Sequence, residues 1–188
     1  MALRRTLDAT VEPVSLPEAK EHLRVTHALD DALIAALITA ARQVAENATG
    51  RSLMTQTWQK TLDRFPDAID LPYPPVQAIQ AVEYLDEAGV LTLLAPASYT
   101  LDERSEPGWL VPAYDVDWPE TQDVVNAVTI TYTAGYADAA AVPEAIKAWI
   151  KLHVGHLYEN REATVPAISI TPLPYLSGLL DGYRVVVV

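Results

Sequence analysis

The sequence predicts an α+β fold: a helical bundle with an inserted small antiparallel β region and an extended C-terminal arm that ends in a strand. Three observations predict it. Apolar residues recur at helical spacing in residues 15–49 and again in 143–161. Residues 53–136 between them are rich in Thr, aromatic and turn residues. The chain closes on four valines, whose β-branched side chains disfavour a helix.

Residues 15–49 are predicted to form a short helix followed by a long amphipathic one. The short helix begins with a capping box, in which the Ser15 hydroxyl and the Glu18 carboxylate each satisfy a backbone amide of the other residue. The long helix ends before Gly50, a residue suited to the left-handed position after a helix. Its apolar residues at helical spacing are Leu33, Leu37, Ala40, Val44 and Ala48.

Residues 53–136 are predicted to form short strands separated by turns. The clearest strand lies in "NAVTITYTAGY", where Val128, Ile130 and Tyr132 alternate with threonines, as in a half-buried strand. The other candidate segments are "TQTWQKTLDRF", "VQAIQAVEYL", "VLTLL", "SYTLD" and "GWLVP".

A helix is predicted to return at residues 143–161, with Pro143 and Glu144 in its first turn. Its predicted inner stripe is Ile146, Ile150, His153 and Leu157. We therefore divide the chain into an N-terminal extended segment (1–14), a main domain (15–163) and a C-terminal arm (164–188). The main domain consists of the helices 15–49 and 143–161 and the β insertion 53–136, and the arm contains one helical turn at "YLSGLL".

The composition bounds the function. The chain has 188 residues, with 25 Asp and Glu against 13 Lys and Arg, for a formal net charge of −12. This balance argues against tight nucleic-acid binding, which needs clustered basic residues, but it is compatible with DNA that passes an acidic wall. The absence of cysteine excludes disulfides, thiolate metal sites and a cysteine nucleophile.

We also expect a soluble protein without a membrane segment or a signal peptide. The N-terminal "MALRRTLDATVEP" contains no apolar core segment. The stretch "ALIAALITAA" is too short to cross a bilayer, which needs about 20 apolar residues.

Candidate catalytic residues are few. His153, His156 and Glu159 recur at steps of three on one helix, which suggests a metal-dependent hydrolase. That spacing, however, drifts about 60° around a helix, and His153 falls on the apolar stripe. The carboxylates Asp102, Glu103 and Glu106 suit a solvated loop better than acid/base catalysis. We expect no enzyme activity, no catalytic residue, no metal and no cofactor.

Two binding hypotheses remain open. The aromatics Trp109, Tyr114 and Trp118 suggest a carbohydrate-binding module, although their setting favours caps on a small β core. The terminal "GYRVVVV" suits strand addition to the exposed sheet edge of a partner. The alternative is that it pairs with the chain's own β region.

Five segments, in this order and spacing, resemble the head–tail connector (adaptor) family of long-tailed phages, prophages and gene transfer agents. They cover roughly residues 15–163 and are "SLPEAKEHLRV", "LIAALITAARQVAENATGRSLMTQTW", "LPYPPVQAIQAVEYLDEAG", "NAVTITYTAGYAD" and "VPEAIKAWIKLHVGHLYENREA".

The resemblance implies a structural protein of the head–tail neck, assembled in the bacterial cytoplasm. Its implied partners are the portal ring, neighbouring copies in a dodecameric ring, the next neck protein or the tail, and double-stranded DNA that passes through the channel without specific binding. The residues expected to bind the portal by strand addition are Tyr183, Arg184, Val185, Val186, Val187 and Val188. The residues expected at ring contacts are Arg42, Glu46, Arg51 and Glu159. A stopper or tail terminator is the alternative within the neck.

Overall fold

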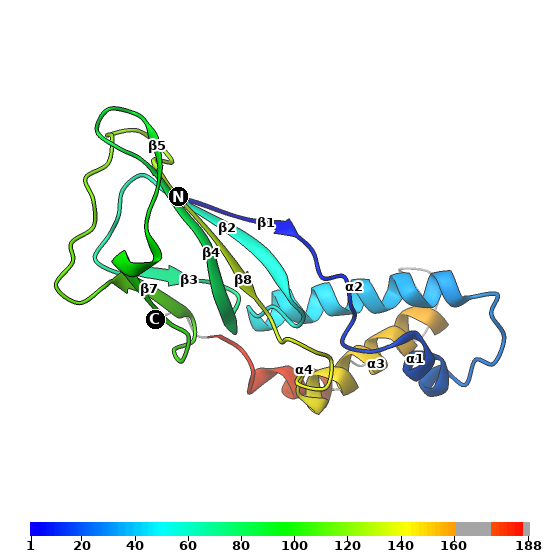
Figure 1. Ribbon diagram of the computed structural model, residues 1–188. Coiled ribbons are helices and arrows are strands. Elements are labelled where there is room, and N and C mark those ends of the chain that lie inside the picture. Colours follow the sequence, from blue (N-terminus) through cyan, green and yellow to red (C-terminus); the bar gives the residue numbers. More distant parts are fainter. Residues whose placement is uncertain (161–173, 186–188) are drawn as a thin grey trace. The chain divides into compact units, whose positions relative to one another are not determined.

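The α+β fold is confirmed by a computed structural model that describes residues 1–160 and 174–185. Within these residues the chain forms two compact units (Figure 1). The β unit comprises Met1–Thr10 and Thr55–Gly135. The helical unit comprises Val11–Met54 and, from Tyr136 onward, residues 136–160 and 174–184.

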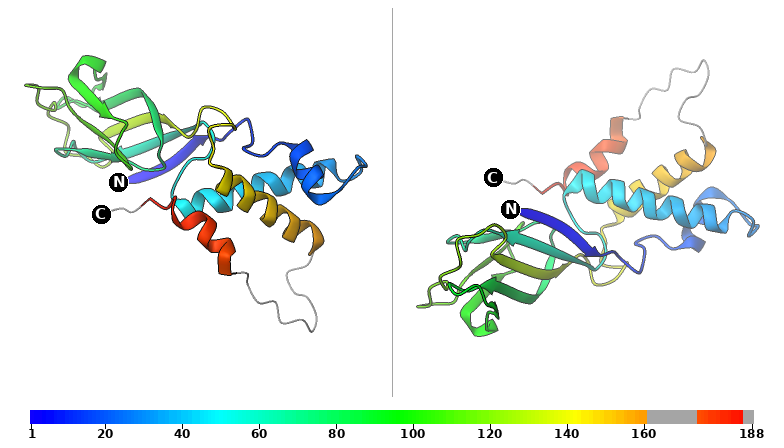
Figure 2. Two further views of the ribbon diagram at one scale, coloured as in Figure 1. Left: turned by 90° about the horizontal axis from the view of Figure 1, so that it is seen from below. Right: turned by 90° about the horizontal axis from the view of Figure 1, so that it is seen from above.

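The helical unit consists of α1 (Leu16–Leu23), α2 (Asp31–Thr49), α3 (Glu144–Glu159) and α4 (Pro174–Asp181). Its centre is α2, which packs against the other three helices (Figure 2). The core is apolar and includes Ile34, Ile38, Ile146, Ile150 and Val154, each at most 1% exposed. The predicted region 15–49 is therefore two helices, and the predicted helix 143–161 is α3.

The predicted helix ends are confirmed. The Ser15 hydroxyl accepts from the Glu18 amide at 3.4 Å, and the Glu18 carboxylate accepts from the Ser15 amide at 2.7 Å, which forms the capping box. The Ser15 hydroxyl also donates to the Glu18 carboxylate at 2.6 Å; this hydrogen bond, followed by the one from the Ser15 amide, lowers the pKa of Glu18. At the other end of the pair, Gly50 follows α2 with φ of +67°.

An amphipathic helix normally buries its apolar stripe, but the apolar series predicted for α2 is not the series that the helix buries. Leu33 and Val44 are 38% and 43% exposed. The residues that α2 buries are one position further along: Ile34, Ile38, Ala41, Arg42, Ala45, Glu46 and Thr49. The sequence contains two series at helical spacing, and packing against α1, α3 and α4 selects the second.

The inner stripe of α3 is also partly different from the prediction. Ile146 and Ile150 are buried as expected, and Trp149 and Val154 complete the buried face. His153 and Leu157 are only partly buried. Helical spacing is compatible with both sets, since 153 and 157 are also four apart, so the packing of α3 against α1, α2 and α4 decides which positions are buried.

The β unit contains two antiparallel sheets. The larger has the order β1 (Ala2–Leu7), β2 (Gln56–Leu62), β8 (Val128–Ala134), β4 (Val76–Leu85), β5 (Leu91–Leu93). The smaller has the order β3 (Ile69–Leu71), β7 (Gly108–Pro112), β6 (Tyr99–Asp102). The six predicted strand segments correspond to β2, β4, β5, β6, β7 and β8.

The centre of the larger sheet is β8, which pairs with β2 on one side and β4 on the other. Its predicted alternation is confirmed, because Val128, Ile130 and Tyr132 are fully buried and the threonines between them are partly exposed. The Tyr132 hydroxyl donates to the Pro72 carbonyl at 2.8 Å, which satisfies the buried polar atom. Burial raises the pKa of Tyr132.

Two strands were not predicted as such. The N-terminal segment, described from the sequence only as extended, forms the edge strand β1 and pairs with β2. Its burial pattern is almost entirely exposed, so it carries no apolar alternation by which to recognise it. The strand β3 has only three residues, which is too short for a periodic signal.

Candidate assembly surfaces

The geometry of α3 does not support a metal site at His153, His156 and Glu159. The His153 ring stacks on Trp149, with ring centroids 4.7 Å apart and planes 12° from parallel. Burial, and secondarily the charge of His156, lowers the pKa of His153. Among the residues that the structure describes, no three or more His, Cys, Asp or Glu side chains form a group that could hold a metal ion.

The candidate carboxylates form a turn. Asp102, at the end of β6, accepts hydrogen bonds from the Ser105 hydroxyl at 2.6 Å and from the Arg104 amide at 2.9 Å. These bonds, the one from Ser105 most, lower the pKa of Asp102. Glu103 and Glu106 are exposed in the same loop. Asp102 therefore shapes the loop between β6 and β7.

The three aromatics that suggested a carbohydrate platform have different surroundings. Trp118 stacks on Phe65, with centroids 4.7 Å apart, and packs against the β core as the sequence favoured. Trp109 is 36% exposed and lines a pocket with Lys60 and Asp70. Tyr114 is 99% exposed.

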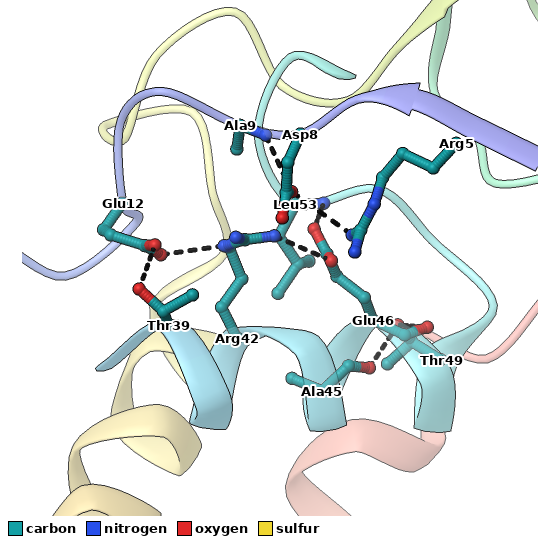
Figure 3. Close-up of polar contacts among 10 residues, drawn as sticks. All are labelled: Arg5, Asp8, Ala9, Glu12, Thr39, Arg42, Ala45, Glu46, Thr49 and Leu53. Atoms are coloured by element: carbon teal, nitrogen blue, oxygen red, sulfur yellow. Dashed lines mark hydrogen bonds and ion pairs between the residues drawn. The ribbon is translucent and has the colours of Figure 1, made fainter. Parts of the chain in front are cut away.

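A buried polar network lies between α2 and the segments that contain Glu12 and Leu53 (Figure 3). Arg42, only 1% exposed, donates to Glu12 at 2.8 Å and to Glu46 at 2.9 Å. Glu46 also accepts from the Leu53 amide at 3.0 Å, and the Thr39 hydroxyl donates to Glu12 at 2.7 Å. The network therefore joins α2 to the segments that precede and follow it.

Three of the four residues expected at ring contacts are buried in this chain, and two of them belong to this network. Arg42, Glu46 and Arg51 are 1%, 3% and 8% exposed. The Arg51 Nε donates to the Tyr183 carbonyl within the helical unit. Within this chain these three side chains are buried, whereas Glu159 is exposed, and the role of the four residues at ring contacts stays a prediction.

The exposed side of α2 has a composition that the sequence reading did not single out. We call it the outer face of α2; its exposed apolar members are Ala32, Leu33, Ala36, Ala40, Val44 and Ala48. Between residues 32 and 49 the only charged residues of the helix are Arg42 and Glu46, and both are buried. The outer face is therefore uncharged. The sequence signal that could have identified it is the presence of two apolar series at helical spacing, of which one helix buries only one.

The negative charge is concentrated in the β unit. Residues 55–135 contain 13 Asp and Glu against three Lys and Arg. One of these three, Lys60, is 1% exposed and forms an ion pair with Asp70 at 2.5 Å. The exposed carboxylates include Glu87, Glu103, Glu106, Asp115, Asp117, Glu120 and Asp123. The loops of the β unit are thus strongly acidic.

The expected portal-binding segment is described only in part. The helix α4 is longer than the single turn predicted and is followed by a turn at Tyr183. Arg184 forms an ion pair with Asp181 at 3.1 Å, and neither Arg184 nor Val185 is in a strand. Val186, Val187 and Val188 lie outside the described residues.

Comparison with known proteins shows which family and which solved structures this chain resembles. Residues 13–85 match the family model of phage gp6-like head-tail connector proteins. This segment includes α1 and α2, with Arg42 and Glu46, together with β2, β3 and β4; Glu12 of the Arg42 network precedes it. The likeness to this family is therefore confined to residues 13–85. No curated protein sequence matches the chain at a significant level.

The solved structures extend the likeness over the whole chain. A chain of the virion of a native gene transfer agent particle is 26% identical, with a TM-score of 0.79 over 100% of this chain and 97% of that one. Two chains from gene transfer agent necks, one computed for an empty particle with C6 symmetry and one for a native particle with C12 symmetry, share the fold at 24% identity. Their TM-scores are 0.81 and 0.76, with the same coverage.

No helix in the part of the chain that the structure describes is both long and apolar enough to span a membrane.

Proposed function

We propose that this chain is a head–tail connector (adaptor) in the neck of a phage-like particle of the gene transfer agent type. The observation that carries the proposal is the full-length likeness to chains of gene transfer agent particles, of which two come from the neck. The connector family match in residues 13–85 supports it independently. In this role the protein forms a ring under the portal, extends the DNA channel and joins the capsid to the tail.

The proposed role is structural rather than catalytic. The family and the structural neighbours point to a neck protein. The residues singled out as catalytic candidates have structural surroundings: His153 packs on Trp149, and Asp102 closes a turn. A protein that must hold its neighbours in place benefits from the internal Arg42 network, because hydrogen-bonded buried ions fix one arrangement of the segments around α2.

The acidic loops of the β unit support passage of DNA without binding. A protein that neutralises phosphates releases counterions and binds DNA tightly, and this requires clustered Lys and Arg. Residues 55–135 of the β unit instead carry 13 acidic and three basic residues. Facing the channel, such loops repel the phosphate backbone and let the duplex slide.

We propose that the residues after Gly182 bind the portal by strand addition. The hydrogen bond from Arg51 to the Tyr183 carbonyl and the burial of Leu180, 2% exposed, supply a fixed anchor on the helical unit for this segment. Strand addition relies on main-chain hydrogen bonds, and successive β-branched residues suit it. Six extended residues reach about 20 Å, enough to reach a neighbouring protein.

The test is binding of the full chain to the portal ring encoded by the same genome. We expect the full chain to bind and a chain stopped after Gly182 to bind much more weakly. As a matched pair, Val186→Pro removes an amide donor, whereas Val186→Thr keeps the donor and the β-branch. If the stopped chain binds as well as the full chain, strand addition is wrong and the connector role stands.

Failure of the full chain to bind any portal preparation would contradict the portal position and favour a stopper or tail terminator. Counting the copies in the reconstituted neck separates these stations further. A twelvefold ring agrees with the native neck computed with C12 symmetry, and a sixfold ring agrees with the alternative positions.

A further inference from the structure

The outer face of α2 is an exposed helix surface without charge. Its exposed apolar members, Ala32 to Ala48 as defined above, follow one another along the full length of the helix. The preceding turn adds Leu29, which is 90% exposed. Surface helices of soluble proteins normally carry charged residues on the side that faces water. In α2 both charged residues that follow the first helical turn, Arg42 and Glu46, are buried instead.

The inner side of α2 is already occupied. Ile34, Ile38, Ala41 and Ala45 are at most 1% exposed, and α1, α3 and α4 pack on the helix. The outer face is therefore a second apolar surface on a helix whose first apolar surface is buried. Rotating the helix to bury the outer face would expose Ile34 and Ile38. It would also separate Arg42 from Glu12 and Glu46 from the Leu53 amide.

We infer that the outer face of α2 binds a second copy of this chain, as one half of the contact between neighbouring subunits. The inference rests on the proposed ring. Chains with this fold occur in necks computed with C6 and C12 symmetry, which repeats a chain around one axis. Contacts in such cyclic rings are heterologous, so the face meets a different surface of the neighbour rather than another α2 outer face.

The dimensions agree with a partial contribution to such a contact. From Ala32 to Ala48 the helix rises about 24 Å, and with a width of about 10 Å the face covers about 240 Å². A stable interface buries about 800 Å² on each partner, so the face supplies about a third of one side. Small residues at positions 32, 36, 40 and 48 allow the backbone of a neighbour to approach closely, with Leu33 and Val44 as larger anchors.

The first test is the self-association of the full chain by sedimentation velocity over a range of concentrations. Ala40→Glu puts a charge at the middle of the outer face and keeps a good helix former. The matched control is Ala97→Glu, the same change at an exposed position in the 3₁₀ turn of the β unit. We expect Ala40→Glu to weaken self-association at least about tenfold and Ala97→Glu to change it less than about twofold.

The second test uses the absence of cysteine, since a single Ala40→Cys or Ala97→Cys is the only thiol in its chain. Maleimide labelling of Ala40→Cys should slow on assembly, and labelling of Ala97→Cys should not. The inference is overturned if the wild-type chain stays monomeric at every concentration, if Ala40→Glu associates like wild type, or if Ala40→Cys stays equally reactive. Circular dichroism identifies an unfolded variant, in which case Val44→Ser replaces Ala40→Glu.

The portal assay separates this inference from the proposed function. Portal binding by the wild-type chain, together with unaltered self-association of Ala40→Glu, retains the connector role and removes the α2 contact. Loss of self-association in Ala40→Glu, with no portal binding by wild type, retains the contact and removes the portal position.

Discussion

Replacing Arg42 by methionine tests whether the polar network on the inner side of α2 stabilises the helical unit. Arg42→Met removes the ion pairs to Glu12 at 2.8 Å and to Glu46 at 2.9 Å and keeps most of the buried aliphatic volume. The side chains of Arg42 and Glu46 are 1% and 4% exposed, whereas Glu12 is 25% exposed. The loss therefore falls mainly on Glu46, whose charge stays buried.

Removing one partner of a buried ion pair typically costs about 3–5 kcal/mol, because the remaining charge is uncompensated. We expect the low end, about 3 kcal/mol, since Glu46 still accepts from the Leu53 amide. Urea unfolding followed by circular dichroism at the helix band reports the change. Adding Glu46→Gln to Arg42→Met should restore part of the loss, because the neutral amide keeps an acceptor for Leu53.

The control is Asn47→Met, an exposed position on the same helix, where a change within about 0.5 kcal/mol is expected. A loss of less than about 1 kcal/mol in Arg42→Met would refute the reasoning, and so would a double variant less stable than Arg42→Met alone. Either result would mean that water or neighbouring groups compensate Glu46.

Two further predictions concern single groups. Burial lowers the pKa of His153, so on acidification below about pH 6.5 the unfolded chain takes up a proton before the folded one and the free energy of unfolding falls. His153→Phe, which keeps an aromatic ring against Trp149, should lose this part of the pH dependence; an unchanged profile from urea titrations at several pH values would contradict it. Tyr132→Phe should lose about 1–2 kcal/mol in urea unfolding, because the Pro72 carbonyl loses its donor. Tyr114→Phe, at a fully exposed position, is the control, and equal stabilities of both variants would rule out this explanation.

Helix ends and strand positions were predictable because the signals are local. A capping box is formed by residues three apart, and a glycine after a helix acts on its own backbone. Ser15, Glu18 and Gly50 accordingly behave as their positions in the sequence predict. The alternation of Val128, Ile130 and Tyr132 is similarly local, since neighbouring side chains of a strand point to opposite faces.

The edge strand β1 and the short β3 were not predicted as strands because neither carries such a signal. Almost all residues of β1 are exposed, and its pairing with β2 joins residues fifty or more positions apart. In the sheet, β2 pairs with β8 on one side, and β1 pairs with its other edge.

The candidate site shows the same division most clearly. By itself, the sequence predicted a long helix that ends before Gly50 and an apolar series through Leu33 and Val44. A second series with the same spacing, through Ile34 and Ile38, was not singled out. Periodicity is identical for both, so it does not decide which series is buried. Only the tertiary structure decided this, because α1, α3 and α4 pack on the second series, and Arg42 and Glu46 are stable on that side only by pairing there. Leu33 and Val44 of the first series are thereby left exposed.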